Sequence, residues 1–288
     1  MIQGALAQSG VVHLRQAIPR VLIRQLRCEI AQLLARRCGQ PPSWWGGIDR
    51  QAVRLFTQDP AVLAGLDREL EALPAFYALA LQSGWRFLLA EQAGWSRACL
   101  SPIHNLRAKL PWCLSQNPFT NVPWHQDYGA TDPADESVAL VTAWVPITQA
   151  SPHHGGLQVI PGSHRLGWLP HRRGEHGPEV CADGLAIRMA QHLDLQPLSI
   201  NARPGDVVLF DQFTLHRGLP NQSNRCRWSL DLRYAEAGHS SGRRGLWRRD
   251  PLVGEAVDTT VMDLVRERLS ALADPATVLH KRVDVDSV

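Results

Sequence analysis

The sequence predicts a mainly β protein, a sandwich or jelly roll, preceded by a helical N-terminal region. Three observations support this fold class. The first hundred residues carry apolar side chains at helical spacing, whereas short β-like runs separated by Pro and Gly begin at about Ala98. No helix of convincing length separates the strands predicted after residue 120, which argues against a parallel βαβ sheet.

The N-terminal region, residues 1–97, is predicted to be mostly helical and to support the β core. A first helix begins after Pro19 and ends at Gly39, just before two prolines. A second helix follows Pro60, where leucines recur every three or four residues. A third is expected over 76–93, with Gly84 as a weak point in it.

The β core is predicted over residues 98–236. Within it, the polar segment 163–195 is rich in His and Arg and is expected to be a lid-like insertion. Residues 237–288 are expected to form a C-terminal extension, so we interpret residues 1–288 as a single domain. The candidate strands are 99–110, 138–147, 157–160, 198–201, 206–210 and 226–234.

Composition limits the partners that we expect. The 288 residues suffice for a sizeable core, and a net charge of +3 is too small to indicate a nucleic-acid-binding protein. Six cysteines without a CxxC pair favour a reducing cytoplasm over a disulfide framework. We expect no signal peptide, because residues 1–14 lack a basic start followed by a long apolar run. We also expect no membrane span, because no apolar stretch reaches about 18 residues. A cytoplasmic monomer or homodimer that binds a small molecule is the resulting expectation.

The strongest chemical signal is the sequence Trp124-His125-Gln126-Asp127. Side chains two residues apart on an extended segment point the same way, so His125 and Asp127 are expected to face one centre. His216 follows a predicted strand 91 residues later and is the candidate third ligand. Distant strands become neighbours in a jelly roll, so this separation is compatible with one site.

Two imidazoles and one carboxylate suit a metal ion that keeps open coordination positions. This ligand set is typical of non-haem Fe(II) that reacts with oxygen, although a catalytic zinc ion could use the same three ligands. Eleven residues after His216 comes Arg227, and Ser229 shares its face on a predicted strand. A guanidinium fork and a hydroxyl can together hold a carboxylate, but Arg225 and Arg233 have the same parity as Arg227.

The order of the motifs resembles the phytanoyl-CoA dioxygenase family of Fe(II)/2-oxoglutarate-dependent oxygenases. The resemblance spans roughly residues 98–236. The matching pieces are the motif at 124–127, Ala143-Trp144-Val145-Pro146, the Gly-rich run 155–164, the run 204–210, His216, Asn221, Arg227 and Tyr234.

The resemblance implies a double-stranded β-helix, a cupin-like jelly roll, with Fe(II) on His125, Asp127 and His216. It also implies that Arg227 binds 2-oxoglutarate, with Ser229 as a helper and Trp144 beside the cosubstrate. The expected reaction consumes O2 and releases succinate and CO2 while it hydroxylates a small molecule, for which the breadth of the family suggests secondary metabolism. The carboxylate of Asp127 argues against a halogenase, which needs that coordination position for chloride. Desaturation, cyclisation, epoxidation and epimerisation use the same ligands as hydroxylation, and the sequence leaves them open.

Polar residues before the His-x-Asp motif also bind the cosubstrate in this family. Lys109 is the candidate here. It shares a face of its predicted strand with Asn105 and Arg107. The opposite face carries His104, Leu106 and Ala108, and the sequence leaves open which face points inward.

Four further residues are predicted to contact the substrate. Arg217 occupies the position after the distal His, where many relatives carry Gly, and Trp168 lies in the lid-like segment. Trp124 and Gln126 belong to the motif itself. The alternative function is a non-oxidative cupin-type lyase, isomerase or binding protein, which would keep the metal ligands but would not use 2-oxoglutarate.

Overall fold

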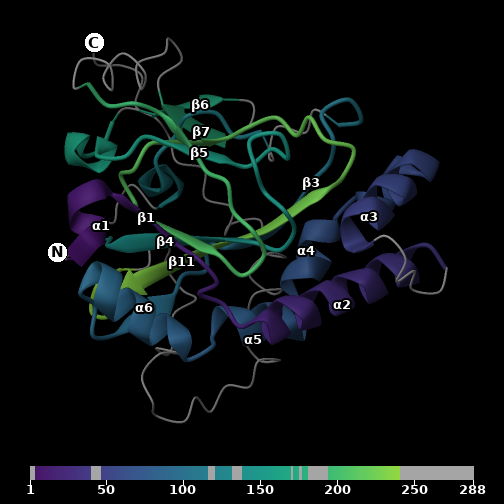
Figure 1. Cartoon of the computed structure of the whole chain (residues 1–288), viewed down its shortest axis with the longest axis horizontal. Coiled ribbons are helices and arrows are strands. Elements are labelled where there is room, and N and C mark those ends of the chain that lie inside the picture. The colour runs from purple at the N-terminus through teal and green to yellow at the C-terminus, as the bar shows by residue number, and fades with distance from the viewer. Residues whose placement is uncertain are drawn as a thin grey trace.

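The computed structural model describes residues 4–39, 47–115, 121–131, 138–169, 171–174, 177–180 and 194–240. Helices dominate the first hundred residues, and antiparallel strands form most of the rest (Figure 1). The helices are α1 (Gly4–Ser9), α2 (Arg20–Arg37), α3 (Gly47–Gln58), α4 (Leu66–Glu71), α5 (Pro74–Ala80) and α6 (Gly84–Ala93), with a short 3₁₀ helix η1 (Pro60–Leu63).

The N-terminal helices form largely where the sequence predicts them. Pro19 precedes the first turn of α2, and Gly39, which adopts a φ of +61°, follows its last turn. The prediction of one helix over 76–93 is wrong in one respect. The segment forms two helices, α5 and α6, and Gly84 is the first residue of α6.

Among the described residues, the larger β-sheet holds six strands, each antiparallel to its neighbours. Its order is β1-β9-β4-β11-β2, and β3 also pairs with β11. The strands are β1 (Val11–Leu14), β2 (Ala98–Leu100), β3 (Asn105–Lys109), β4 (Leu140–Pro146), β9 (Val207–Asp211) and β11 (Arg227–Glu236). The first of these strands was not predicted, because it lies inside the region expected to be helical.

A smaller sheet faces the larger one. It consists of β10 (His216–Gly218), β5 (Leu157–Val159) and β8 (Leu198–Ser199), and a bridge between His125 and His216 adds a further segment beside β10. Two opposed antiparallel sheets with helices outside the larger one make the mainly β jelly roll that the sequence predicts. Within the segment expected to be a lid, residues 171–174 and 177–180 form a hairpin, β6 and β7.

The larger sheet has a hydrophobic core on each of its faces, because successive side chains along each strand point to opposite sides. On β4, Val141, Ala143 and Val145 belong to the core that the sheet shares with the helices, whereas Trp144 belongs to the core between the sheets. On β11, the even-numbered residues from 228 to 234 pack toward the helices. The odd-numbered residues 227, 229, 231 and 233 therefore point between the two sheets.

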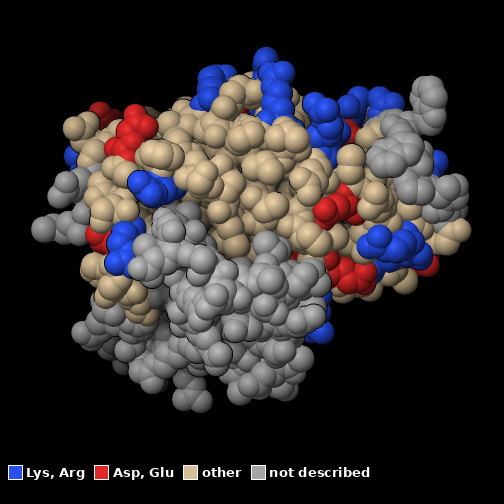
Figure 2. Space-filling view, turned by 90° about the horizontal axis from the view of Figure 1, so that it is seen from below, with Lys and Arg blue, Asp and Glu red and all other residues tan. Residues whose placement is uncertain are grey.

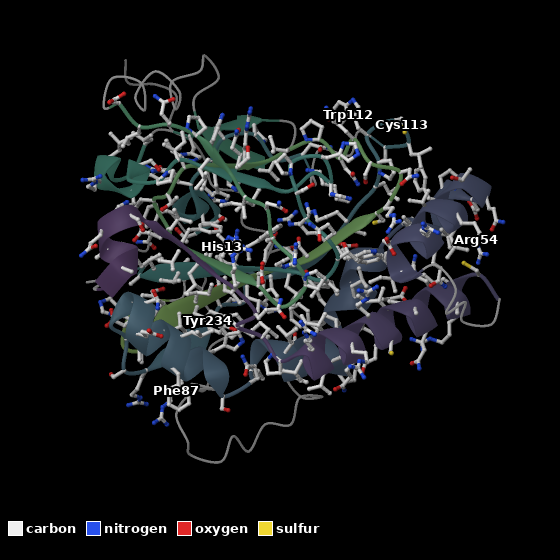
Figure 3. The ribbon with its side chains drawn as sticks, viewed as in Figure 1. His13, Arg54, Phe87, Trp112, Cys113 and Tyr234 are labelled. Carbon is white, nitrogen blue, oxygen red and sulfur yellow. The ribbon has the colours of Figure 1, made fainter. Side chains whose placement is uncertain are left out.

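The helical layer is tied to β11 by aromatic side chains. Tyr234 lies against Trp85 of α6, with ring centroids 5.1 Å apart, whereas Phe87 lies on the outer side of α6 and is exposed (Figure 3).

Figure 2 views the molecule from the side of these helices. The described part of that face shows charged residues gathered toward its margins and a broad uncharged middle. No helix in the described ranges combines the length and apolarity that crossing a membrane requires.

Candidate metal and cosubstrate site

Three potential metal ligands meet between the sheets. His125, Asp127 and His216 each offer one ligand atom, and these atoms lie within 4.8 Å of one another. The backbones of His125 and His216 exchange two hydrogen bonds, of 3.0 and 3.1 Å, which fix the two rings side by side. Extended backbone runs through Gln126, and Asp127 then begins a 3₁₀ turn, η2 (Asp127–Ala130). The expectation that the motif residues face one centre agrees with this geometry.

Both imidazoles are held in the form that binds metal. Nδ1 of His125 lies 2.8 Å from the Pro123 carbonyl, and Nδ1 of His216 lies 3.0 Å from the Thr214 carbonyl, so each Nδ1 carries the proton that it donates. Each Nε2 lies 3.8 Å from Oδ1 of Asp127. Burial lowers the pKa of both rings, which keeps them neutral and leaves each Nε2 available as a ligand.

Asp127 is held by two donors. Arg233 donates to its Oδ1, and the hydroxyl of Thr142 donates to its Oδ2. Burial alone would raise the pKa of Asp127, but the charge of Arg233 reverses this effect and holds the pKa well below its usual range. The carboxylate is therefore charged and fixed in orientation before any metal arrives.

Arg227 differs from the other arginines of its parity, because it makes no ion pair with any carboxylate of the described residues, although the charge of Asp231 favours its cationic form. One of its terminal nitrogens donates to the hydroxyl of Ser229, and its buried Nε has no partner among the described residues. Burial lowers its pKa to about 10, so the side chain stays cationic at neutral pH. Its guanidinium carbon lies 5.7 Å from the ring centre of Trp144.

The two alternative arginines are already engaged. Arg225 is 46% exposed and pairs with Asp49 of α3 at 3.4 Å. Arg233 pairs with Asp127. A buried cation without an anionic partner is costly, so of these three arginines Arg227 is the one that could still accept an anion.

The polar face of β3 points inward. Arg107 donates through Nε to Asp231 of β11, and Lys109 is fully buried, where it donates to the carbonyl of Leu219. Leu106, on the opposite face, packs in the core beside the helices. Burial, together with the charges of Arg227 and Arg107, lowers the pKa of Lys109 to about 6. The question that the sequence left open is thus settled in favour of the face of residues 105, 107 and 109.

Most of these groups line one small cavity, but Lys109 and Ser229 do not. Its volume is about 50 Å³, and both sheets contribute to its walls. The walls include the three candidate ligands together with Trp144, Arg227, Asp231 and Arg107. The cavity therefore brings two imidazoles, the carboxylates of Asp127 and Asp231 and the guanidinium of Arg227 together with apolar side chains.

None of the four residues predicted to contact substrate lines this cavity. Gln126 is fully buried, and its amide bonds the backbone at Gly167, Leu169 and Phe213. Trp124 lies under the guanidinium of Arg217, 4.9 Å from ring centre to Cζ. Trp168 stacks on His171 with ring centroids 4.2 Å apart. The structure assigns Gln126 a role in holding neighbouring backbone, and substrate contact by the other three stays a prediction.

The sequence did not point to Thr142 and Asp231 as functional groups, and it offered Arg233 only as an alternative to Arg227. The period of two along β4 and β11 is a signal that could have found them, since it puts Thr142 on the face of Trp144 and the other two on the face of Arg227.

Comparison with known proteins identifies a family. The model of the family described as phytanoyl-CoA dioxygenase (PhyH) matches residues 6–229. A 1-deoxypentalenic acid 11-beta-hydroxylase from Streptomyces exfoliatus is 32% identical over 139 residues, which are 46% of this chain and 47% of that protein. A probable phytanoyl-CoA dioxygenase from Caenorhabditis elegans is 26% identical over 200 residues, 64% of this chain and 59% of that protein. The chain thus spans about half the length of the curated relatives it matches.

Solved structures share the fold. A non-heme alpha ketoglutarate dependent epimerase, SnoN from nogalamycin biosynthesis, is similar with a TM-score of 0.55 and 16% identity, covering 86% of this chain and 84% of that one. The structure of SnoN with Fe3+, alpha ketoglutarate and nogalamycin RO gives a TM-score of 0.56 and 18% identity, over 82% and 84% of the two chains. At sequence identities this low, the comparison shows a shared fold and nothing about function.

Proposed function

Because the chain belongs to the phytanoyl-CoA dioxygenase (PhyH) family, we propose that it is an Fe(II)- and 2-oxoglutarate-dependent oxygenase that oxidises a small molecule. The reaction consumes O2, releases succinate and CO2, and in its simplest form hydroxylates the substrate. The whole chain acts in this proposal as one oxygenase domain, in which the jelly roll holds the site and the helices support the larger sheet.

The convergence of His125, Asp127 and His216 is the observation that carries the proposal. Two neutral imidazoles and a charged carboxylate within 4.8 Å fit a ferrous ion and leave coordination positions for other ligands. When bound, the iron would supply the oxygen chemistry. The chain itself fixes the imidazole tautomers through Pro123 and Thr214 and orients the carboxylate through Arg233 and Thr142.

Arg227 is the proposed partner of the distal carboxylate of 2-oxoglutarate. Its buried charge, which pairs with no carboxylate among the described residues, supports this role, and Ser229 holds the guanidinium in place. Trp144 forms an apolar wall beside it, and a bound dianion would favour the ammonium form of the nearby Lys109, which takes its proton from solvent. These four residues orient the cosubstrate and keep water from it in our proposal.

Anaerobic reconstitution tests the proposal directly. Addition of Fe(II) and 2-oxoglutarate to the purified protein should give a weak visible charge-transfer band, and Asp127→Ala should abolish it. Arg227→Ala should keep metal binding and lose cosubstrate affinity, whereas the exposed Arg225→Ala serves as the matched control and should lose neither. A metal-loaded protein that binds no 2-oxoglutarate would favour the non-oxidative alternative.

A further inference from the structure

The backbone between the first two candidate ligands is held by a histidine from another segment of the chain. Gln126 lies between His125 and Asp127, and its N–H donates to Nε2 of His171 at 3.0 Å. His171 is 3% exposed, and its Nδ1 lies 2.7 Å from the carbonyl of Leu169. Because Nε2 accepts a hydrogen bond, Nδ1 carries the ring proton and donates it to this carbonyl. The ring of His171 is therefore fixed at both nitrogens.

The side chain of Gln126 makes three further hydrogen bonds to backbone groups. Its amide nitrogen donates to the carbonyls of Gly167 and Phe213, at 2.7 Å each, and its amide oxygen accepts from the N–H of Leu169 at 2.9 Å. The side chain is fully buried, so loss of these bonds would leave buried polar groups unsatisfied. Phe213 lies three residues before His216, the third candidate ligand. Gln126 thus connects the segment that carries the first two ligands with the segment that leads to the third.

Aromatic stacking fixes the plane of the His171 ring. The ring of Trp168 lies parallel to it, with an interplanar angle of 2° and centroids 4.2 Å apart. Tyr128, the residue after Asp127, contacts Trp168 at a centroid distance of 5.1 Å, so the stacked pair also touches the turn that follows the second ligand. His171 is thus held on one face and at both nitrogens, as a rigid support for the backbone of Gln126.

On the basis of the proposed function, we propose that His171 and Gln126 are positioning residues for the metal site. Neither side chain lines the cavity of the candidate ligands, so both act through the backbone. The bond to His171 fixes the peptide between His125 and Asp127, and the side-chain amide of Gln126 fixes that peptide relative to His216. The three ligand atoms then lie within 4.8 Å of one another before a metal binds.

A purely structural role of these residues predicts a different result. Loss of a hydrogen bond that only stabilises the fold lowers the free energy of unfolding, but the protein that stays folded keeps its metal affinity. Loss of a positioning bond also lowers the metal affinity of the folded protein, because binding must then order ligands that no longer lie ready.

His171→Phe tests the positioning role. The variant removes the acceptor but keeps an aromatic ring against Trp168, and the Kd of Mn(II), measured by EPR titration, should rise by about tenfold. The two backbone bonds between His125 and His216 remain, so binding should weaken and not disappear. Gln126→Met, which removes all three side-chain bonds, should raise the Kd at least as much.

His171→Gln tests rescue by a conservative variant. The amide oxygen of a glutamine can take the position of Nε2 and accept from the N–H of Gln126. The Kd of Mn(II) should therefore return to within about threefold of that of the unaltered protein. A Kd as high as in His171→Phe would overturn the role of the acceptor.

His13→Phe is the matched control. His13 lies on β1, an edge strand of the larger sheet (Figure 3), and its Nε2 lies 3.2 Å from Oδ2 of Asp206. This variant also loses a hydrogen bond made by an imidazole ring, but not one to the ligand motif, so the Kd of Mn(II) should change by less than about twofold. Urea denaturation measures the stability of each variant alongside. An unchanged Kd in His171→Phe, or an equal rise in His13→Phe, would overturn the inference.

The inference and the proposed function can fail separately. In metal-free protein, hydrogen exchange at the N–H of Gln126 should be faster by about tenfold or more in His171→Phe, and an equal rate would contradict the inference alone. A protein that gives the Fe(II)–2-oxoglutarate band, but whose Mn(II) affinity His171→Phe leaves unchanged, would likewise contradict only the inference. A protein that lacks the band, but loses Mn(II) affinity in His171→Phe, would contradict only the proposed function.

Discussion

Arg233 donates to the same oxygen of Asp127 that lies 3.8 Å from Nε2 of both His125 and His216. The proposed metal ligand is therefore also one half of a buried ion pair. This arrangement keeps the carboxylate charged and aimed at the two imidazoles, because the pKa of Asp127 is held well below its usual range. Thr142 fixes the other oxygen, so the carboxylate is restrained from both sides.

Loss of Arg233 should weaken metal binding. In Arg233→Met the buried carboxylate loses its cationic partner, and we expect metal affinity to fall by about 10–100-fold, as for other residues that orient ligands. The free energy of unfolding should also fall by about 3–5 kcal/mol, because an unpaired buried charge remains. Titration with Mn(II) and urea denaturation measure the two effects.

Thr142→Val provides the graded comparison. It removes one hydrogen bond to Asp127 but leaves the ion pair, so its effect on metal affinity should be smaller than that of Arg233→Met. If both variants bound Mn(II) as tightly as the unaltered protein, Arg233 and Thr142 would have no role in positioning the ligand.

Removal of Arg227 should affect the cosubstrate and not the metal. Arg227→Ala should raise the Kd of 2-oxoglutarate by about a hundredfold, since a charge-assisted contact in a buried site contributes roughly 1.5–3 kcal/mol. Ser229→Ala should raise it less, because the hydroxyl only helps to orient the guanidinium. Calorimetry on the Mn(II)-loaded protein separates the effects, and an unchanged Kd in Arg227→Ala would refute the assignment.

Lys109 should make cosubstrate binding depend on pH. Its pKa in the free protein is about 6, so the amine is largely neutral at pH 7. A bound dianion nearby favours the ammonium form and raises this pKa. Binding therefore takes up a proton above about pH 6, and the affinity for 2-oxoglutarate should decrease as the pH rises through that window.

Lys109→Met is the variant that checks this dependence. The affinity for 2-oxoglutarate should change by at most about tenfold per pH unit in the unaltered protein, and by less in the variant.

The stability of the protein provides a second measurement. Between about pH 6 and 10 the unfolded chain binds a proton at Lys109 that the folded chain lacks, so the stability of the unaltered protein gains from rising pH, and the variant lacks this gain. Equal slopes for both proteins would contradict the assignment.

Local motifs explain how much of the candidate site could be proposed from the sequence. Residue type and spacing predicted His125, Asp127 and His216, which the structure brings together, whereas the cosubstrate roles of Arg227 and Ser229, proposed from the period of two on one strand, stay predictions. The same period could not choose among Arg225, Arg227 and Arg233. That choice depends on partners far away in sequence, Asp49 for Arg225 and Asp127 for Arg233.

The fold was predictable to a similar extent. The strands around the motifs were expected, whereas β1 is only four residues long and forms by pairing with β9, almost two hundred residues later. A short strand of this kind owes its structure to its partner rather than to its own sequence. Most of the predicted C-terminal extension, residues 241–288, lies outside the described residues.

The aromatic contact between the helices and β11 should contribute measurably to stability. Trp85 donates to the carbonyl of Leu79 at 2.8 Å, and the hydroxyl of Tyr234 donates to the carbonyl of Ala80 at 2.7 Å. Both carbonyls belong to the last turn of α5, where no helical partner is available to them. Tyr234→Phe leaves the buried carbonyl of Ala80 without this donor, which should lower the free energy of unfolding by about 1–3 kcal/mol.

Phe87→Ala, on the exposed side of α6 (Figure 3), is the control and should change the free energy of unfolding by less than about 0.5 kcal/mol. Urea denaturation compares the two, and an equal loss in both would mean that the hydrogen bond to α5 does not stabilise the layer beneath the site.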